Sequence, residues 1–354
     1  MKSPDITRKF VFLGEYPQTL KSDNVKSTNC VDGYWIGNDG ERYIKAAAKL
    51  TVGMGLPTPF FSNGNIVVND QEYFFKVEPI KWMVLNEDDE TELLLCDKVI
   101  NSMQFCNITY DCEDNFFNPA QINTKFKIRV IGYDKGCVIV ERRDPISNGI
   151  AIRTERYHYI DDISHRIHDN NYQFSDIRKW LNTQFYSLAF NELEKQKILT
   201  VEVDNSAEMS EPFKTKSWND VQKQAFNRHM GNPYNADDKD SFSCENTNDK
   251  VFLVSVKELT DVNYGFSSAY GRGKNPIIEL SKKVSDYGIA NGAWVSEAHP
   301  NGCGWWWLRS PNLSRADIVH MVRFDGRIYS DEFYPSDQFG GVVPAIKINK
   351  KKLL

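Results

Sequence analysis

The chain has 354 residues, of which 41% are hydrophobic and 26% are charged, proportions typical of a globular protein. Its net charge of −5 and pI near 5.8 argue against a basic surface for nucleic acid. We therefore expect no nucleic-acid partner. We also expect no membrane span, because no apolar run reaches the length of a membrane-spanning helix.

The compartment is inferred from the N-terminus and the cysteines. Residues 1–8 lack the apolar core of a secretory signal. The seven cysteines form no C-x-x-C pair, and Cys96 and Cys137 lie in apolar runs, where a free thiol packs as a small hydrophobe. We predict a reduced, cytoplasmic protein; the alternative is a surface or extracellular location, if a signal has been removed.

The first 170 residues favour antiparallel strands. An apolar strand begins at Phe10 and is expected to end at Gly14, and residues 73–96 resemble a strand meander. Glu41–Leu50 has a short helical pattern. Two further apolar runs flank a turn at residues 133–136. We interpret residues 116–168 as a strand-rich insertion in a single domain that spans residues 1–354.

Helical patterns follow. Ser175 can cap a helix with a periodic apolar face, and Asn191 with Glu194 three residues later predicts a second helix start. The remaining expected elements are helices at Trp218–His229 and Ile277–Gly288, a polar loop at Pro233–Asn248 and a buried strand at Val251–Ser255.

Three consecutive tryptophans dominate the segment Gly302–Pro311. Successive side chains cannot all share one face of a strand or turn, and a buried indole N–H needs an acceptor. At least one ring should therefore enter the core. We predict a structural hub made of Trp305, Trp306, Trp307 and Arg309.

A hairpin is expected after Pro311. Asp325-Gly326 is a strong tight-turn signal between alternating apolar residues. The segment of residues 312–340 mixes aromatic, arginine and acidic side chains, a composition typical of binding surfaces. The candidate ligand-binding residues are Arg315, Asp317, His320, Arg323, Asp325, Arg327, Tyr329, Asp331, Phe333, Tyr334, Asp337 and Gln338. An ordinary solvated hairpin is the alternative interpretation.

Five segments carry recognisable motifs: Phe12–Gln18, Pro79–Leu85, Ile177–Asn182, Phe252–Ser255 and Trp306–Pro311. In this order they resemble an uncharacterised bacterial domain family common in gut Firmicutes and their phages. The motifs of that family are F-G-x-Y-P-Q, P-I-x-W-x-V-L, L-R-x-W-L-N, F-L-L-S, W-W-L-R-S-P and a closing G-V-R-P-A. Val343 stands where the last motif has arginine, so a buried arginine pairing expected there is missing.

The resemblance implies a fold similar to the C-type-lectin-like fold of formylglycine-generating enzymes. This is an α+β fold with short antiparallel strands, two or more helices and many loops. In some such proteins the stretch after W-L-R-S-P is diversified by retroelements and displayed for ligand binding. The favoured function is therefore non-catalytic recognition of a protein or glycan ligand through residues 312–340.

Catalytic alternatives find weak support. A formylglycine-generating oxidoreductase would need a cysteine pair that can hold copper, and Cys303 has no cysteine beside it in the sequence. His165 and His168 lack a third metal ligand at a recognised spacing, and Gly271–Lys274 lacks the ending of a phosphate-binding loop. We expect no catalytic residue, metal or cofactor. The oxidoreductase and a structural phage or surface module remain alternatives.

Overall fold

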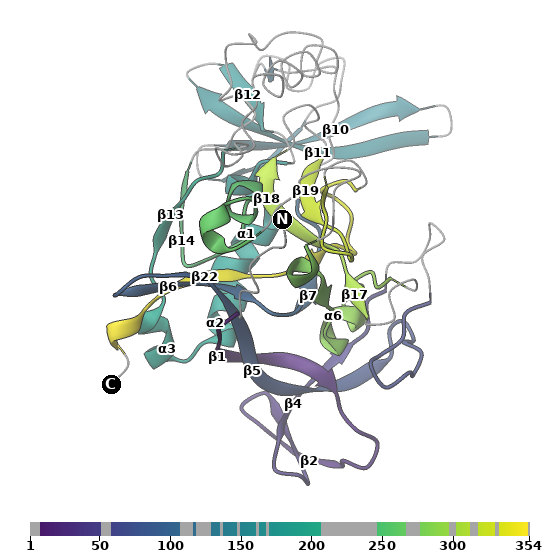
Figure 1. The fold of residues 1–354 in the computed structure, drawn as a ribbon. Helices are drawn as coiled ribbons and strands as arrows, with labels where there is room; N and C mark the ends of the chain where they lie inside the picture. Colours follow the sequence, from purple (N-terminus) through teal and green to yellow (C-terminus); the bar gives the residue numbers. More distant parts are fainter. Residues whose placement is uncertain are drawn as a thin grey trace.

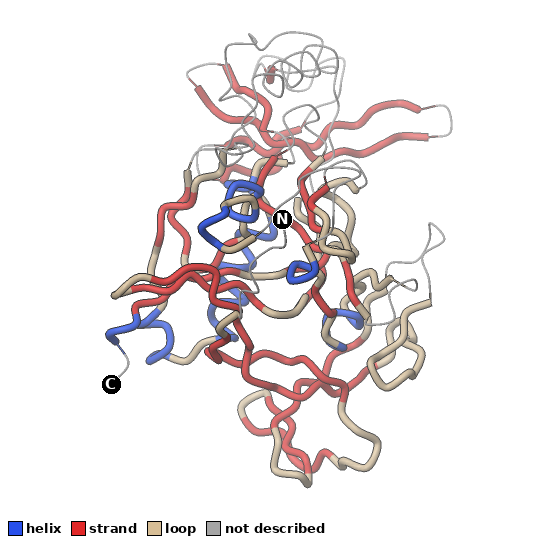
Figure 2. The backbone as a smooth tube through the Cα atoms, viewed as in Figure 1, coloured by secondary structure: helices blue, strands red, loops and turns tan. Residues whose placement is uncertain are grey.

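A computed structural model describes residues 8–50, 58–106, 170–206, 246–266, 277–296, 302–311, 318–329 and 333–352, and the strands within residues 116–167. These residues form mainly antiparallel sheets with a few short helices and many loops, so the fold is mixed α+β (Figures 1 and 2). None of the described helices is both long enough and apolar enough to cross a membrane.

The largest sheet of the described residues has eight strands, ordered β15-β22-β6-β5-β4-β3-β2, with β1 also pairing with β5. All of its pairs are antiparallel. The strands are β1 (Phe10–Leu20), β2 (Ser27–Val31), β3 (Tyr34–Gly37), β4 (Arg42–Ala47), β5 (Glu72–Glu87), β6 (Thr91–Cys96), β15 (Val251–Phe252) and β22 (Ala345–Asn349).

A second sheet contains the tryptophan segment and the predicted hairpin. Its order is β20-β19-β18-β21-β7. The strands are β7 (Asn101–Ser102), β18 (Trp306–Pro311), β19 (Val319–Val322), β20 (Ile328–Tyr329) and β21 (Gly341–Val342). β19 pairs with β20 across the Asp325-Gly326 turn, where Gly326 has a φ of 85°, so the hairpin is confirmed.

The strands expected within residues 116–168 are also present. They are β8 (Phe116–Phe117), β9 (Arg129–Asp134), β10 (Cys137–Ile146), β11 (Gly149–Ile160) and β12 (Ile163–Ile167). They pair with one another in the order β8-β12-β11-β10-β9, and Figure 1 draws β10–β12 at one end of the molecule. That this segment is an insertion into one domain stays a prediction. Two short sheets pair β13 (Val201–Val203) with β14 (Thr247–Asp249) and β16 (Lys282–Lys283) with β17 (Cys303–Gly304).

The helices are short and capped as predicted. The Ser175 hydroxyl accepts from the backbone N–H of Arg178, and Asn191 with Glu194 forms a capping box. The first helical stretch is η2 (Tyr172–Phe174), α1 (Asp176–Trp180), a π-turn η3 (Leu181–Phe185) and α2 (Tyr186–Ala189). The others are α3 (Glu192–Lys197), α5 (Val256–Leu259), η6 (Val262–Tyr264), η7 (Ile278–Leu280), α6 (Asp286–Ala290) and η8 (Lys350–Lys352).

Three expectations about elements are wrong. Glu41–Leu50 contains β4 instead of a helix, because pairing with β5 satisfies its backbone groups. Ile277–Gly288 is broken into η7, β16 and the start of α6. β1 continues past Gly14, which has a φ of 71° at a bulge. The expected helix Trp218–His229 and most of the Pro233–Asn248 loop lie outside the described residues.

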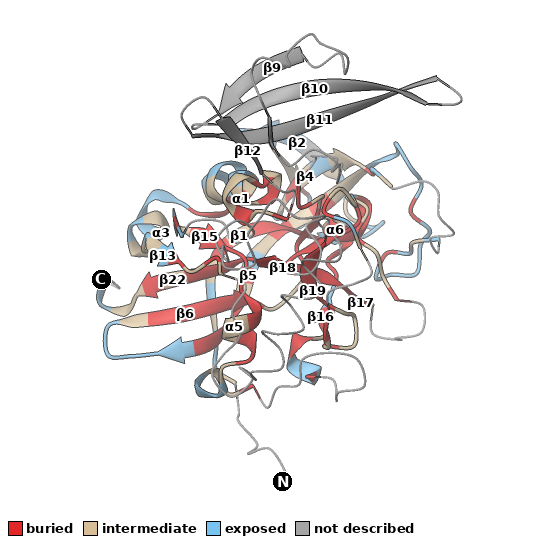
Figure 3. Ribbon diagram, turned by 90° about the horizontal axis from the view of Figure 1, so that it is seen from above, coloured by how far each residue is buried: buried red, intermediate tan, exposed pale blue. Residues whose placement is uncertain are grey.

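The motif segments hold the elements together. Arg178 donates from Nε to Asp249 at 2.9 Å, and the Asn182 amide donates to the Val251 carbonyl at 2.8 Å. Asp286, the first residue of α6 and outside those segments, does the same: its carboxylate accepts from the backbone N–H groups of Leu20 and Ser62 at 2.8 and 2.7 Å. These polar groups join helices to the sheet, and Figure 3 shows buried residues concentrated in β6, β18, β19 and β22.

Candidate functional site

The tryptophan hub lies in the interior. The Trp306 indole donates to the Leu280 carbonyl, and the Trp307 indole donates to that of Met103, each at 3.0 Å. Trp305 stacks on Phe333 with ring centroids 4.4 Å apart, and its indole nitrogen has no hydrogen-bond partner among the described residues. β18 is therefore a rigid base for the residues that follow it.

Within the candidate ligand-binding segment, residues 312–340, the structure buries some of the candidate residues and leaves others partly exposed. Arg315, Asp317 and Asp331 lie outside the described residues. His320 is only 6% exposed and Tyr329 only 5%, since β19 and β20 turn both side chains toward the core. The Nδ1 atom of His320 lies 3.0 Å from the Ser310 carbonyl oxygen. Burial removes these two residues from the surface that was expected to bind ligand.

The β19–β20 turn carries two arginines, of which Arg323 is supported by aromatic rings. The Arg323 guanidinium lies 5.3 Å from the Phe324 ring centroid and 5.4 Å from that of Tyr329. The Phe324 ring lies 5.5 Å from Trp294. Arg327 pairs with Asp325 at 3.1 Å and keeps 37% of its side chain exposed. The turn therefore places Arg323 beside two aromatic rings and Arg327 in an ion pair with Asp325.

The loop after β20 adjoins the same tryptophan. The backbone N–H of Trp294 donates to the Phe339 carbonyl at 3.2 Å, while the Trp294 ring packs on Phe324. Tyr334 is 51% exposed, and Asp337 accepts from its backbone N–H at 2.7 Å. We call the set Trp294, Arg323, Phe324, Arg327, Tyr334 and Gln338 the aromatic–arginine surface.

Arg309, within β18 and four residues after Trp305, lies in a buried polar network. Its guanidinium donates to both carboxylate oxygens of Glu258, at 2.7 and 2.9 Å, and to the Leu253 carbonyl at 2.5 Å. Glu258 also completes a capping box with Ser255, and the Ser310 hydroxyl accepts from the Val256 N–H at 2.9 Å. The F-L-L-S and W-W-L-R-S-P motif segments therefore meet at Glu258.

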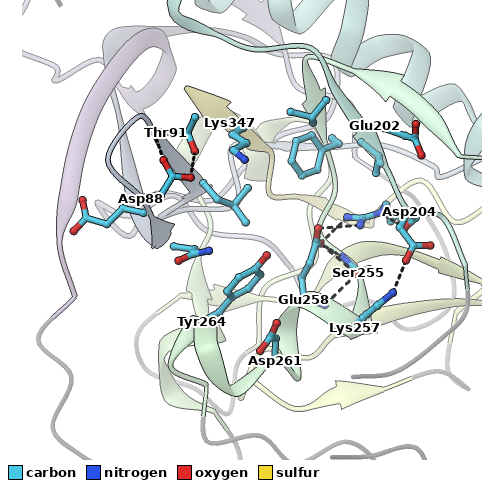
Figure 4. Close-up of a pocket in the computed structure, with 17 residues that line it drawn as sticks. Asp88, Thr91, Glu202, Asp204, Ser255, Lys257, Glu258, Asp261, Tyr264 and Lys347 are labelled. Atoms are coloured by element: carbon cyan, nitrogen blue, oxygen red, sulfur yellow. Dashed lines mark hydrogen bonds and ion pairs between the residues drawn. The ribbon is translucent and has the colours of Figure 1, made fainter. Parts of the chain in front are cut away.

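A cavity of about 340 Å³ opens beside this network (Figure 4). It is bounded by the β5–β6 turn, β13, β22, the α5–η6 segment and Arg309. Its lining residues are Asn86, Glu87, Asp88, Thr91, Leu93, Val201, Glu202, Val203, Asp204, Phe252, Ser255, Lys257, Glu258, Asp261, Tyr264, Arg309 and Lys347. We call it the Arg309 cavity.

The charges of the Arg309 cavity are partly neutralised within it. Lys257 donates to Asp204 at 2.6 Å. Partial burial alone would raise the pKa of Asp204, but its hydrogen bonds, chiefly that from Lys257, lower this pKa to about 2. With Arg309 bound to Glu258, two of the three cations in the lining are thus paired with carboxylates of the lining.

Sequence reasoning missed most of this cavity. Its residues come from segments that are far apart in the chain, so no local pattern joins Asp88 to Tyr264 or Lys347. Arg309 in its motif and the Ser255–Glu258 capping box were the available signals. A second cavity of about 450 Å³ lies between β1 and α2, where Arg42 pairs with Glu15 and Glu194 accepts from the Gly14 N–H.

The cysteines and histidines considered for catalysis or metal binding do not form a site among the described residues. Cys303 is 4% exposed in β17, and burial raises the pKa of the Cys96 thiol to about 12. Within the described residues, no three His, Cys, Asp or Glu side chains converge as metal ligands would. The side chains of His165 and His168 lie outside the described part of the chain.

Comparison with known proteins identifies a family but no characterised relative. Neither the curated proteins nor the solved structures contain a match. The family model described as "Domain of unknown function (DUF6273)" matches residues 147–350. These include the helical stretch after Ser175, the hub and the Arg309 network, whereas Phe12–Gln18 and Pro79–Leu85 precede them. Because the match spans more than half of the 354 residues, the chain belongs to the DUF6273 family.

Proposed function

We propose that this chain is a non-catalytic recognition protein on a C-type-lectin-like α+β scaffold, and that a protein or glycan ligand binds its aromatic–arginine surface. The observation that carries the proposal is the ring support of Arg323, whose guanidinium lies beside Phe324 and Tyr329. An arginine held by rings loses little side-chain entropy when it binds a carboxylate or hydroxyl group.

The base of this surface is stiff. Phe333 stacks on Trp305 with an interplanar angle of 9°, and Phe339 meets both rings edge to face. The Ser281 hydroxyl donates to the Phe324 carbonyl, and this hydrogen bond joins the turn to the residue that follows η7. A binding loop fixed by a packed core has a small ordering cost on association, which favours recognition.

No observation on the described residues favours the alternatives. An oxidoreductase of the formylglycine-generating type needs an accessible thiol pair, whereas Cys303 is buried with no other described cysteine bonded to it. The polar side chains of the motif segments, among them Arg178, Asn182 and Arg309, bind neighbouring backbone groups or partner side chains. Such contacts join one element to another, so they support a scaffold.

The experiment is a binding screen with a matched counter-screen. The purified chain is tested on a glycan array and against a random peptide display library, and each hit is retested on Arg327→Ala/Tyr334→Ala. Both side chains are partly exposed, so we expect the variant to fold normally and to lose the hits. Lys351→Ala, which removes one exposed cation from a distant element, is the control that should keep them. Hits that bind the double variant and the parent equally would contradict the proposal.

A further inference from the structure

Two hydrogen-bond donors face the Arg309 cavity without a partner among the described residues. Lys347 on β22 lies opposite Leu93 of β6, and its ammonium makes no hydrogen bond or ion pair with the described chain. The Tyr264 hydroxyl likewise has no described partner, although the Tyr264 carbonyl accepts from Arg8. In Figure 4 the two polar ends point toward the middle of the cavity from opposite sides.

Carboxylates with an unused oxygen line the same space. Asp261 accepts from the Asn263 N–H at 2.8 Å through one oxygen, and its second oxygen accepts no hydrogen bond from a described residue. Glu202 accepts from the Asn246 amide at 3.0 Å in the same one-sided way. Asp261 and Tyr264 belong to the α5–η6 side, opposite Lys347 (Figure 4).

Between these polar groups the lining is apolar. Leu93, Val201, Val203 and Phe252 come from three strands, and Val203 and Phe252 are buried. A cavity of about 340 Å³ is at the small end of the range for ligand sites, which suits a compact molecule. The Arg309–Glu258 and Lys257–Asp204 pairs are already satisfied and form fixed walls.

We propose that the Arg309 cavity binds a small zwitterion of amino-acid or dipeptide size. Its carboxylate would pair with Lys347, its ammonium with Asp261 and the Tyr264 oxygen, and its apolar body would cover Leu93 and Phe252. Lys347, Asp261 and Tyr264 would then each gain a charge-assisted hydrogen bond in a partly desolvated space. This inference does not rest on the aromatic–arginine surface.

The charge pattern distinguishes this ligand from simpler ions. The lining holds six carboxylates and three cations, so a purely anionic ligand would be repelled. A purely cationic ligand would repel the Lys347 ammonium and would leave it without a partner in the cavity. A bound metal ion would need converging ligands, and the described side chains provide no such set of three.

The Tyr264 hydroxyl is protonated at neutral pH. Burial raises its pKa to about 12, with smaller contributions from the carboxylates of Glu258 and Asp261. At neutral pH its hydroxyl therefore remains able both to donate to a ligand and to accept from an ammonium group.

The test is isothermal titration calorimetry of the full chain with leucine, phenylalanine and the dipeptide Leu-Leu, each free and with one end blocked. We expect at least one free zwitterion to bind, and N-acetylation or C-terminal amidation to weaken it about tenfold, the value of one charge-assisted contact. The free amino acids and the dipeptide distinguish the two sizes, and binding of either supports the proposal.

Two variants test the orientation. Lys347→Met should weaken the free zwitterion about tenfold but leave its amide unaffected, because the amide lacks the carboxylate that Lys347 pairs with. Asp261→Asn should weaken the free zwitterion but leave the N-acetyl form unaffected. Lys351→Met, at an exposed lysine bound to Glu90, is the charge-matched control and should change nothing.

Three outcomes would overturn the inference. The first is that no free zwitterion gives a heat of binding at ligand concentrations up to about 10 mM. The second is equal binding of blocked and free forms. The third is that Lys347→Met weakens binding of the C-terminal amide as much as binding of the free zwitterion. Circular dichroism of each variant, compared with the parent, separates these outcomes from failure to fold.

Discussion

Trp306 and Trp307 are the residues on which the hub's stability should depend most directly. Both indoles are fully buried, and each nitrogen donates to a main-chain carbonyl from another segment. We expect Trp306→Ala and Trp307→Ala each to lower the free energy of unfolding by about 3–5 kcal/mol. Urea unfolding checks this, with Trp35→Ala, at a half-buried ring, as the control. Parent-like midpoints in both hub variants would contradict it.

The Arg309–Glu258 pair makes a different prediction. Arg309 is 2% exposed, so removing its partner leaves a buried charge without compensation. Glu258→Gln should lower the free energy of unfolding by about 3–5 kcal/mol, whereas Arg309→Met/Glu258→Leu should recover a large part of that loss. A double-mutant cycle in urea, with Arg309→Met and Glu258→Leu as its single variants, measures the coupling. If the double variant is as unstable as the sum of the single ones, the pair is not coupled as described.

His320 should make stability depend on pH. Burial lowers its pKa to about 4 in the folded chain, against about 6.5 when unfolded. Between these values the unfolded chain binds a proton that the folded chain does not, so stability falls as the pH falls from about 6.5 to about 4. The loss should approach roughly 3 kcal/mol at the acid end of this range.

Urea unfolding at several pH values tests this, with His320→Gln as the comparison. The variant should start less stable but should lose less on acidification, because glutamine does not titrate. Identical pH dependence of the variant and the parent across this range would show that His320 does not contribute.

At the scale of elements, the β19–β20 turn depends on one glycine. A Cβ on Gly326 would lie 2.0 Å from the Ile277 carbonyl oxygen, and the residue has a φ of 85°. Gly33 has almost the same φ of 83°, but a Cβ added there would meet no described atom within 4 Å, so it serves as a matched control.

Gly33→Ala should cost only the conformational strain of about 1–2 kcal/mol, and Gly326→Ala should cost clearly more because a backbone atom must also move. Melting temperatures of the two variants compare the effects. Equal losses would mean that the contact with Ile277 is dispensable.

Local signals predicted the elements they control. Ser175 and Asn191 begin helices because their side chains accept backbone N–H groups within the same turn, an interaction that sequence alone specifies. β4 was expected as a helix because its pairing partner, β5, is distant in sequence. Tyr329 was expected at the surface because alternation shows that a strand has two faces, but does not show that its sheet is covered on both.

At the scale of the whole molecule, two candidate sites border the hub. Trp305, just before β18, stacks on Phe333 next to the aromatic–arginine surface, and Arg309 within β18 lines the cavity. The first site was partly predictable, because most of its residues lie in one segment after a diagnostic motif. The second was not, since Lys347 of β22, Asp261 at the start of η6 and Asp88 of the β5–β6 turn are brought together only by the folded chain.

The measurement that tests recognition most directly pairs affinity with stability in Arg327→Ala/Tyr334→Ala. For a glycan or peptide selected on the parent chain, the Kd of the variant should rise at least about tenfold, the effect of losing central contacts. Its free energy of unfolding should stay within about 0.5 kcal/mol of the parent's, since both side chains are partly exposed. An unchanged Kd, or a loss of binding that accompanies a loss of folding, would contradict a display surface at these residues.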